Sequence, residues 1–251
     1  MLNLADWHKR FIQQSRWTEE LRHYLYNQLK IDQDQRILEV GCGSGAVTAD
    51  LSQATPAKVY GLDLRFEYVE FASKNENKPH FACGDALSLP YAPASFDCCL
   101  CHFFLLWLKD PRRGLKEMRR VTHPGGIIAA LAEPDYGGRI DYPDELVELG
   151  QMQADALQKQ GADPHLGRRL ASLFVEAGLI NVQTGLLGGH WGSPPSFEAW
   201  ESEWSVLKSD LGGQVDQEKL AHLQAVDKTA WQKGQRILFV PTFYAWGTVP
   251  Y

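Results

Sequence analysis

A glycine-rich turn at residues 37–45, ILEVGCGSG, holds the residues whose types and spacing most clearly indicate chemistry. An apolar run containing Glu39 is followed by Gly41, Gly43 and Gly45, spaced two apart. Glycine has no Cβ, so it tolerates positive φ angles and lets the backbone approach a ligand closely. Backbone N–H groups at such a turn suit a phosphate or nucleoside group. The turn therefore predicts a nucleotide-type cofactor without deciding which one.

Two cofactor patterns fit the turn. Gly41, Gly43 and Ala46 satisfy G-x-G-x-x-G/A, the pattern typical of dinucleotide binding. The same stretch also reads E-x-G-x-G-x-G from Glu39 to Gly45. The glycines alone do not separate the two patterns, so the distinction depends on residues elsewhere in the chain.

Two acids further along the chain favour the second pattern. It calls for an acid at the end of the second strand, to bind ribose hydroxyls, and Asp63 in GLDL stands there. It also calls for an acid after the third strand, near the adenine, and Asp85 in CGDALSLPY meets that requirement. A dinucleotide-binding dehydrogenase leaves Asp85 unexplained.

These residues can form one site only in a fold that brings the ends of several strands together. Short apolar runs alternate with helical patterns along the chain, and this alternation predicts such a fold. We expect an α/β, doubly wound, Rossmann-like fold with a seven-stranded, mostly parallel sheet, helices on both faces and a helical lid. The expected strands are 36–40, 58–64, 80–86, 96–103, 125–134, 179–187 and 236–247. The expected helices outside the alternating region are 4–30, 143–160, 163–178, 196–212 and 216–233.

We interpret residues 1–251 as one domain, since no linker long enough to separate domains is visible. Residues 1–35 supply N-terminal helices and residues 36–135 the cofactor-binding half. Residues 136–251 form the substrate-side half with inserted lid helices. In a doubly wound sheet the ligand lies at the carboxyl ends of the strands, where the candidate polar residues fall.

Four motifs in the right order give the chain a family resemblance. ILEVGCGSG, GDALSLPY, FDCCLCHFFLLWLKDP and HPGGIIAAL are similar to LDxGCGxG, GDAxxLPF, FDxVxxxxxLxWLxDP and PGGxL. This set resembles the class I S-adenosylmethionine-dependent methyltransferases, in the small-molecule, UbiE-like (type 11) branch. The resemblance covers about residues 36–133. Leu106 departs from it, because many relatives have histidine there.

The resemblance implies S-adenosylmethionine as cofactor and S-adenosylhomocysteine as product. Asp63 would bind the ribose diol with Leu64 packing on the adenine, and Asp85 would receive the adenine amino group. The N-terminal helix would bring Arg16 to the methionine carboxylate as a charge-assisted pair. The full set of implied cofactor-binding residues is Arg16, Glu39, Gly41, Cys42, Gly43, Asp63, Leu64, Asp85, Ala86 and Cys101.

The implied reaction is an in-line displacement at an activated methyl carbon, with a small-molecule methyl acceptor as partner. Where the acceptor must lose a proton, a general base helps, and His102, Glu133 and Tyr136 are the candidates. A structural role for His102 remains open. His190 and Trp191, after the sixth expected strand, could also reach the acceptor or simply pack a loop. No acid cluster shows metal-ligand spacing, so no metal is expected.

Net charge and the cysteines indicate which partners and which cellular compartment to expect. The net charge is -6, and no long Lys/Arg run provides a footprint for nucleic acid. The five cysteines read as small buried side chains in a reducing compartment. No apolar run approaches the roughly 20 residues that a membrane span needs. We expect a cytoplasmic protein, and the sequence leaves its oligomeric state open.

Three alternatives remain. A short-chain dehydrogenase needs a Tyr-x-x-x-Lys after the fourth strand, but the chain has this spacing only at Tyr26 and Lys30, ahead of the glycine turn. A non-catalytic cofactor-binding scaffold would keep the same residues. A DNA, RNA or protein acceptor is disfavoured, because CHFF replaces the [Asn/Asp]-Pro-Pro-[Tyr/Phe] turn after the fourth strand and no Pro-Cys pair occurs.

Overall fold

The computed structural model describes residues 4–75, 79–186, 196–213 and 215–251. The chain divides into two compact units. The first comprises Met1–Glu133, Arg169–Gly185 and Phe243–Tyr251. The second comprises Pro134–Arg168 and Leu186–Thr242. His190 and Trp191 lie outside the described residues.

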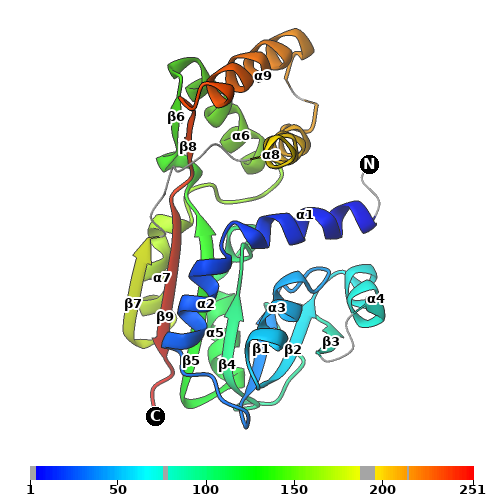
Figure 1. Ribbon diagram of the computed structural model, residues 1–251. Helices are drawn as coiled ribbons and strands as arrows, with labels where there is room; N and C mark the ends of the chain where they lie inside the picture. Colours follow the sequence, from blue (N-terminus) through cyan, green and yellow to red (C-terminus); the bar gives the residue numbers. More distant parts are fainter. Residues whose placement is uncertain (1–3, 76–78, 187–195, 214) are drawn as a thin grey trace. The chain divides into compact units, whose positions relative to one another are not determined.

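The first unit is built on a seven-stranded sheet of order β3-β2-β1-β4-β5-β9-β7 (Figure 1). β1 pairs in parallel with both β2 and β4, and β3 and β5 extend the parallel sheet. The start of β5 is bonded to the end of β9, through Gly125 N–H to Val249 O at 2.8 Å, so β9 runs antiparallel. The strands are β1 Arg36–Val40, β2 Lys58–Asp63, β3 His80–Cys83, β4 Phe96–Cys101, β5 Thr122–Pro134, β7 Ile180–Leu186 and β9 Thr242–Thr248.

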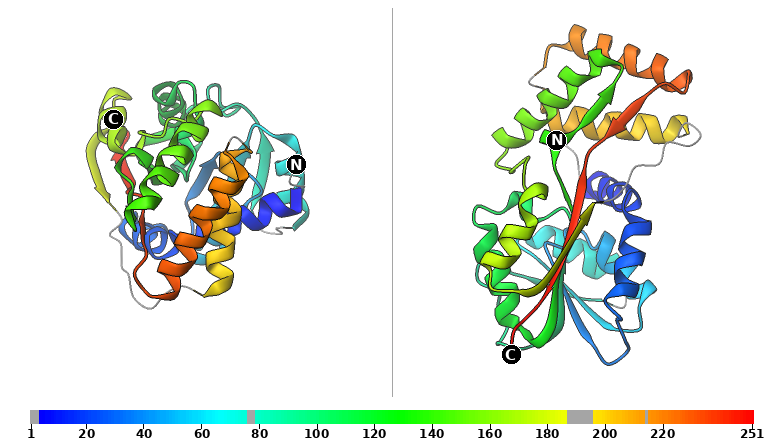
Figure 2. Two further views of the ribbon diagram at one scale, coloured as in Figure 1. Left: turned by 90° about the horizontal axis from the view of Figure 1, so that it is seen from above. Right: turned by 90° about the vertical axis from the view of Figure 1, so that its left-hand side faces the viewer.

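Helices cover both faces of this sheet. The right-hand view of Figure 2 shows α5 and α7 on one side and α2 and α3 on the other. The helices of the unit are α1 Leu4–Arg16, α2 Glu19–Gln28, α3 Ala46–Ala54, α4 Phe66–Asn75, α5 Pro111–Val121 and α7 Leu170–Glu176, with the short 3₁₀ helices η1 Leu105–Trp107 and η4 Gly167–Arg169 beside them in sequence. The predicted doubly wound, mostly parallel Rossmann-like fold is confirmed.

The second unit has a helical core and a two-stranded antiparallel sheet of β6 Ile140–Tyr142 and β8 Ile237–Phe239. Its helices are α6 Val147–Lys159, α8 Phe197–Leu211 and α9 Gln217–Gln232, with η2 Tyr136–Gly138 and η3 Asp144–Leu146. Trp200 and Trp204 are buried in its apolar core, as their shared helix face indicates. Ser196 caps α8 through a bond from Ala199 N–H, and Gly212 ends that helix in the left-handed conformation.

Three predicted elements differ from the structure in where they begin or end. Residues 4–30 form two helices rather than one, separated at Trp17 and Thr18. The helix expected over 163–178 begins only at Leu170, because Asp163 accepts a bond from His165 N–H and forms a turn instead. The strand over 80–86 ends at Cys83.

The strand expected over 236–247 is two strands. β8 pairs with β6, whereas β9 joins the seven-stranded sheet, and Val240 and Pro241 separate them. Proline cannot donate to a sheet ladder, so the break falls where the sequence places it. β6 has only three residues and escapes the sequence pattern.

The division into residues 1–35, 36–135 and 136–251 stays a prediction, as does the role of the inserted helices as a lid. The two compact units do not follow those boundaries, because 169–185 and 243–251 belong to the first unit. Among the described residues, no helix is both long enough and apolar enough to cross a membrane.

Candidate functional site

The glycine turn between β1 and α3 has the backbone conformation that its composition predicts. Gly41, Gly43 and Gly45 have φ angles of +77°, +52° and +86°, a region that side chains with a Cβ rarely adopt. Gly41 N–H donates to Leu62 O at 2.7 Å, which ties the turn to the neighbouring strand β2. Gly45 is the N-cap residue of α3. The turn therefore places backbone N–H groups at the carboxyl edge of the sheet.

Two aromatic rings lie directly on this turn. A Cβ added at Gly41 would stand 2.0 Å from Phe104 Cδ2, and one at Gly43 would stand 3.2 Å from Phe11 Cε2. Phe11 belongs to α1, and Phe104 immediately precedes η1. Neither contact was predicted, because both residues are distant in sequence from the glycines. The rings make the turn a tight, largely apolar cradle.

Asp63 lies at the end of β2 and its carboxylate reaches the glycine turn. Oδ2 accepts a bond from Gly43 N–H at 2.8 Å, and Oδ1 accepts one from Arg65 N–H at 2.9 Å. Each oxygen has two lone pairs, so each keeps acceptor capacity in a fixed orientation. Leu64 follows with 69% of its surface exposed. A fixed acceptor beside an exposed apolar side chain suits a ribose diol next to an aromatic base.

Asp85 and Ala86 follow β3 at the same edge of the sheet. Asp85 is exposed and accepts a bond from Leu87 N–H at 2.8 Å, whereas Ala86 is buried. β2 and β3 are neighbouring parallel strands, and the carboxyl ends of parallel strands meet at one edge, so Asp63 at the end of β2 and Asp85 just after β3 lie at the same edge. The predicted contact of Asp85 with the adenine stays a prediction.

Glu39 is buried beneath the turn, with 2% of its surface exposed. Thr48 Oγ1 donates to its carboxylate, and burial raises the pKa of Glu39 to about 7. Burial also raises the pKa of the Cys42 and Cys101 thiols well above their ordinary value, so both are neutral. All five cysteines are free as predicted, but Cys83 is exposed rather than buried.

Residues 38–130, which contain this site, match the family model of the methyltransferase domain. The chain therefore carries a methyltransferase domain of this family over residues 38–130. An uncharacterized methyltransferase of Schizosaccharomyces pombe is 31% identical over 59% of this chain and 57% of its own length. A demethylmenaquinone methyltransferase of Renibacterium salmoninarum is 33% identical over 41% of this chain and 44% of its own length. The chain thus spans about half the length of the curated relatives it matches.

Solved structures share the fold at low identity. The YcgJ protein of Bacillus subtilis gives a TM-score of 0.60 at 19% identity, covering 93% of this chain and 99% of that one. Phosphoethanolamine N-methyltransferase 2 of Haemonchus contortus, solved with S-adenosylhomocysteine, gives 0.60 at 17% identity over 93% and 53% of the two chains. These likenesses support the methyltransferase fold alone.

The residues of the site fit S-adenosylmethionine, the cofactor of the methyltransferase family. The glycine cradle excludes any Cβ, the Asp63 carboxylate keeps open acceptor positions, and Leu64 offers an exposed apolar surface. Arg16, which was expected at the methionine carboxylate, is exposed at the end of α1. Its contact with the cofactor stays a prediction.

His102, one of the candidate bases, follows β4 and is half-buried. Its Nε2 lies 2.7 Å from Thr18 Oγ1, and burial lowers its pKa to about 3, with the Arg22 charge contributing. The folded chain therefore favours the neutral imidazole. Arg22 is itself buried and donates to Thr18 Oγ1 at 2.9 Å. No local sequence signal links Thr18 or Arg22 to His102, since they pack together only in the folded chain.

Glu133 is fully buried at the end of β5 and is engaged by the backbone. Oε1 accepts bonds from Phe104 N–H and Leu105 N–H, each at 2.9 Å, and Oε2 accepts one from Leu106 N–H at 3.3 Å. Burial raises its pKa to about 7. Glu133 was a candidate general base, but its carboxylate is taken up by the first turn of η1 and by Phe104, whose ring lies on Gly41.

Tyr136 belongs to the second unit, where it begins η2. It is half-buried, and its backbone N–H donates to Pro164 O at 2.8 Å. The neighbouring Asp135 is buried and accepts from Arg168 through both carboxylate oxygens, one bond being 2.8 Å long. Asp135 is thereby committed to Arg168, whereas the role of Tyr136 stays a prediction.

Proposed function

We propose that this chain transfers a methyl group from S-adenosylmethionine to an oxygen, nitrogen or carbon atom of a small-molecule acceptor and releases S-adenosylhomocysteine. The observation that carries the proposal is the bond from Gly43 N–H to Asp63 Oδ2. It joins the glycine cradle and the acid after β2 into one preformed site inside the matched methyltransferase domain.

The bound sulfonium supplies a methyl carbon that is already activated toward a nucleophile. The residues of this chain hold and orient the reactants: Asp63 binds the ribose hydroxyls, and the glycine turn receives the methionine portion. Alignment of two bound reactants lowers a barrier by roughly 7 to 11 kcal/mol. The rings of Phe104 and Phe11 pack against Gly41 and Gly43 of the turn.

Among the three candidates for the general base, Tyr136 is retained. The neutral His102, with a pKa of about 3, is a poor proton acceptor, because an efficient base has a pKa near the working pH. Glu133 is occupied by three backbone N–H groups. We therefore propose that Tyr136 contacts the acceptor, with its hydroxyl as donor or acceptor of a hydrogen bond.

A small-molecule acceptor is favoured by the relatives and by the charge. The similar proteins include demethylmenaquinone methyltransferases and O-methyltransferases. The net charge of -6 disfavours a nucleic-acid acceptor. Five free cysteines fit a reducing compartment, so we place the enzyme in the cytoplasm.

The first test is thermal unfolding with S-adenosylmethionine, S-adenosylhomocysteine, NAD or NADP added separately. A ligand at 100 times its dissociation constant stabilises the folded chain by roughly 2.7 kcal/mol. We expect this shift with both sulfur nucleosides, its loss in Asp63→Ala and its retention in Asp34→Ala, an exposed acid away from the site. A shift with the nicotinamides alone contradicts the proposal.

A second measurement separates an enzyme from a non-catalytic scaffold. The chain is incubated with methyl-labelled S-adenosylmethionine and a panel of phenols, amines and acidic carbon compounds, and transfer of the label is measured. We expect labelled product from at least one class of acceptor, and less of it from Tyr136→Phe. Tight cofactor binding with no transfer to any class would favour the scaffold.

A further inference from the structure

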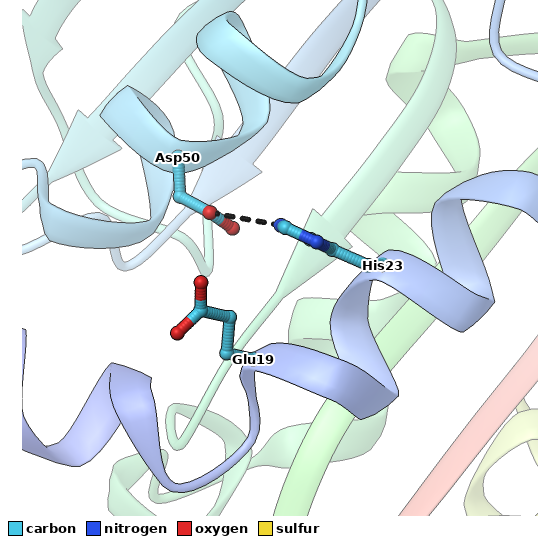
Figure 3. A group of neighbouring side chains, drawn as sticks. All are labelled: Glu19, His23 and Asp50. Atoms are coloured by element: carbon cyan, nitrogen blue, oxygen red, sulfur yellow. Dashed lines mark hydrogen bonds and ion pairs between the residues drawn. The ribbon is translucent and has the colours of Figure 1, made fainter.

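Three side chains with metal-ligand atoms gather on the surface of the first unit, and neither the candidate site nor the reaction uses them. Glu19 and His23 belong to α2 and Asp50 belongs to α3 (Figure 3). One ligand atom from each residue lies within 4.8 Å of the other two. A tetrahedral ion with bonds of about 2.0–2.2 Å holds its ligands closer together than this, and exposed side chains can close the difference.

The sequence places two of these ligands on one helix face. Residues four apart in a helix are neighbours, so Glu19 and His23 project side by side from the first turns of α2. Pairs of ligands at this spacing occur in zinc-binding helices. The third ligand is distant in the chain, and packing of α2 near α3 brings it in. Spacing along the sequence alone therefore does not reveal the set.

Asp50 is held in one orientation by two buried donors. Its Oδ2 accepts from Arg22 Nε at 3.1 Å and from the Tyr26 hydroxyl at 3.2 Å. Both donors are buried, with 2% and 4% of their surfaces exposed. Oδ1 is left facing His23 Nε2 at 3.1 Å. Hydrogen bonds of this kind to a carboxylate ligand are typical of the outer shell of metal sites.

The charge and the donor set indicate the class of ion. Two carboxylates beside one guanidinium leave one net negative charge, which attracts a divalent cation. Calcium and magnesium prefer sites made entirely of oxygen, whereas an imidazole nitrogen with two carboxylates suits zinc and similar ions. Without an ion, His23 and Asp50 form a simple hydrogen bond. An ion would take the place of the shared proton.

We propose that Glu19, His23 and Asp50 bind one divalent transition-metal ion of the zinc type, which clamps α2 to α3. The clamp would hold the N-terminal helices on the cofactor half, because α3 follows directly from the glycine turn. α1 already contacts that turn through His8 Nδ1 and Ser44 Oγ at 2.8 Å. The ion has no part in methyl transfer, so this inference does not rest on the proposed function.

The test is calorimetric titration of the full chain with Zn²⁺ after treatment with a chelator. A Cys83→Ser background removes the exposed thiol as a competing ligand. We expect one ion per chain, no heat from Mg²⁺, and an affinity lowered at least about tenfold in Glu19→Gln and in His23→Gln. Glu20→Gln and His222→Gln are matched exposed controls on α2 and α9 and should keep the affinity of the parent.

Unfolding of the variants does not confuse the result, because Glu19 and His23 are exposed on α2. Without metal, the melting temperature of Glu19→Gln should equal that of the parent, and that of His23→Gln should be only slightly lower, because His23 loses its bond to Asp50. Zn²⁺ should raise the melting temperature of only the parent and the two controls. Asp50 is left unchanged in the main test, since it also pairs with the buried Arg22. No binding at millimolar Zn²⁺, or equal affinity in His23→Gln and the parent, overturns the proposal.

Discussion

The two compact units of the chain treat their buried polar groups differently. In the second unit Asp227 accepts bonds from the Nε1 atoms of Trp200 and Trp204, at 2.6 and 2.7 Å, and from Arg236 at 2.6 Å. In the first unit Asp63 accepts two backbone bonds and keeps further acceptor positions at the edge of the sheet. A closed network of donors indicates a structural role, whereas fixed acceptors with remaining capacity indicate a ligand.

A second network of the same kind supports this comparison. The buried Arg139 and Asp141 form an ion pair, and Arg139 also donates to Gln153. Gln153 Nε2 in turn donates to Asp210 at 2.8 Å. All four residues belong to the second unit, and they link β6, α6 and α8. The polar interior of this unit is thus used for cohesion.

The stabilising role of the polar network in the second unit is tested most directly at Asp227. Asp227→Ala leaves two buried indole N–H groups without their acceptor, whereas Arg236 keeps Glu203 as a partner at 2.7 Å. An unsatisfied buried donor costs about 1–3 kcal/mol. We expect denaturant unfolding followed by tryptophan fluorescence to show this loss, and Asp155→Ala, an exposed acid on α6, to show none. A loss below 1 kcal/mol would mean that the network contributes little to cohesion.

One glycine from each unit, Gly41 and Gly161, allows a direct comparison of how tightly the backbone is packed. Gly41 and Gly161 both have positive φ angles, +77° and +96°, but a Cβ meets Phe104 at Gly41 and nothing within 4 Å at Gly161. Left-handed strain costs roughly 1–2 kcal/mol at either position, and crowding adds roughly 1–3 kcal/mol at Gly41. We therefore expect Gly41→Ala to unfold more readily than Gly161→Ala. We expect only Gly41→Ala to lose the stabilisation by S-adenosylhomocysteine.

Equal costs at the two glycines would show that Phe104 yields without penalty. In that event the tight cradle would not be a fixed feature of the site, and binding of the nucleoside should survive Gly41→Ala. Calorimetric titration of both variants with S-adenosylhomocysteine distinguishes these outcomes.

The first unit also contains buried polar groups that are fully engaged, such as Arg22 and Glu133. Glu133 allows a test by pH. Burial raises its pKa from 4.5 to about 7, so its protonated form is favoured in the folded chain. The folded state therefore binds more protons between these values, and stability falls as the pH rises through that window. Glu133→Gln lacks this dependence, so its deficit relative to the parent should shrink by about 2 kcal/mol between pH 5 and pH 8.

Urea unfolding at a series of pH values measures this deficit. Taking the difference between two proteins removes the contributions of Glu39 and His102, which also have shifted pKa values. Asp97→Asn, an acid with an ordinary hydrogen bond to Arg36 N–H at the amino edge of the sheet, is the control. A constant deficit across this range would place the Glu133 carboxylate in a better solvated environment than its burial indicates.

Local patterns made the first unit predictable. Strand β1, the glycine turn and Asp63 fall within 28 residues, and their order along the chain alone places them at one edge of a parallel sheet. The fold class and the grouping of Gly43 with Asp63 follow from this order. The hydrogen bonds of Glu133 were not predicted, because they are not local in the sequence. Its partners, Phe104 to Leu106, lie 27–29 residues away, and no motif records the contact.

The second unit was predictable only in its helices. Ser196 and Asp216 signal helix starts that the structure confirms, because capping is a local property. The pairing of Trp200 with Asp227 depends on how α8 meets α9, and the periodicity of each helix gives no register between them. The same limit hid the break at Thr18, whose hydroxyl is needed by His102.

The smallest effect tests whether the first unit holds a nucleoside at its carboxyl edge. Cys83 ends β3 opposite Asp63 in the sheet register, and its thiol donates to Leu64 O at 3.4 Å. It is exposed, whereas the other four cysteines are buried, so a thiol reagent should modify Cys83 first. Saturating S-adenosylhomocysteine should slow this modification several-fold without any change in folding. Asp63→Ala should abolish the protection, and NAD should give none.

Because the reagent reports on one atom beside Leu64, unprotected labelling under conditions where calorimetry shows binding would move the adenosine away from β2 and β3. The acceptors at this edge would then have to be assigned a structural role like those of the second unit.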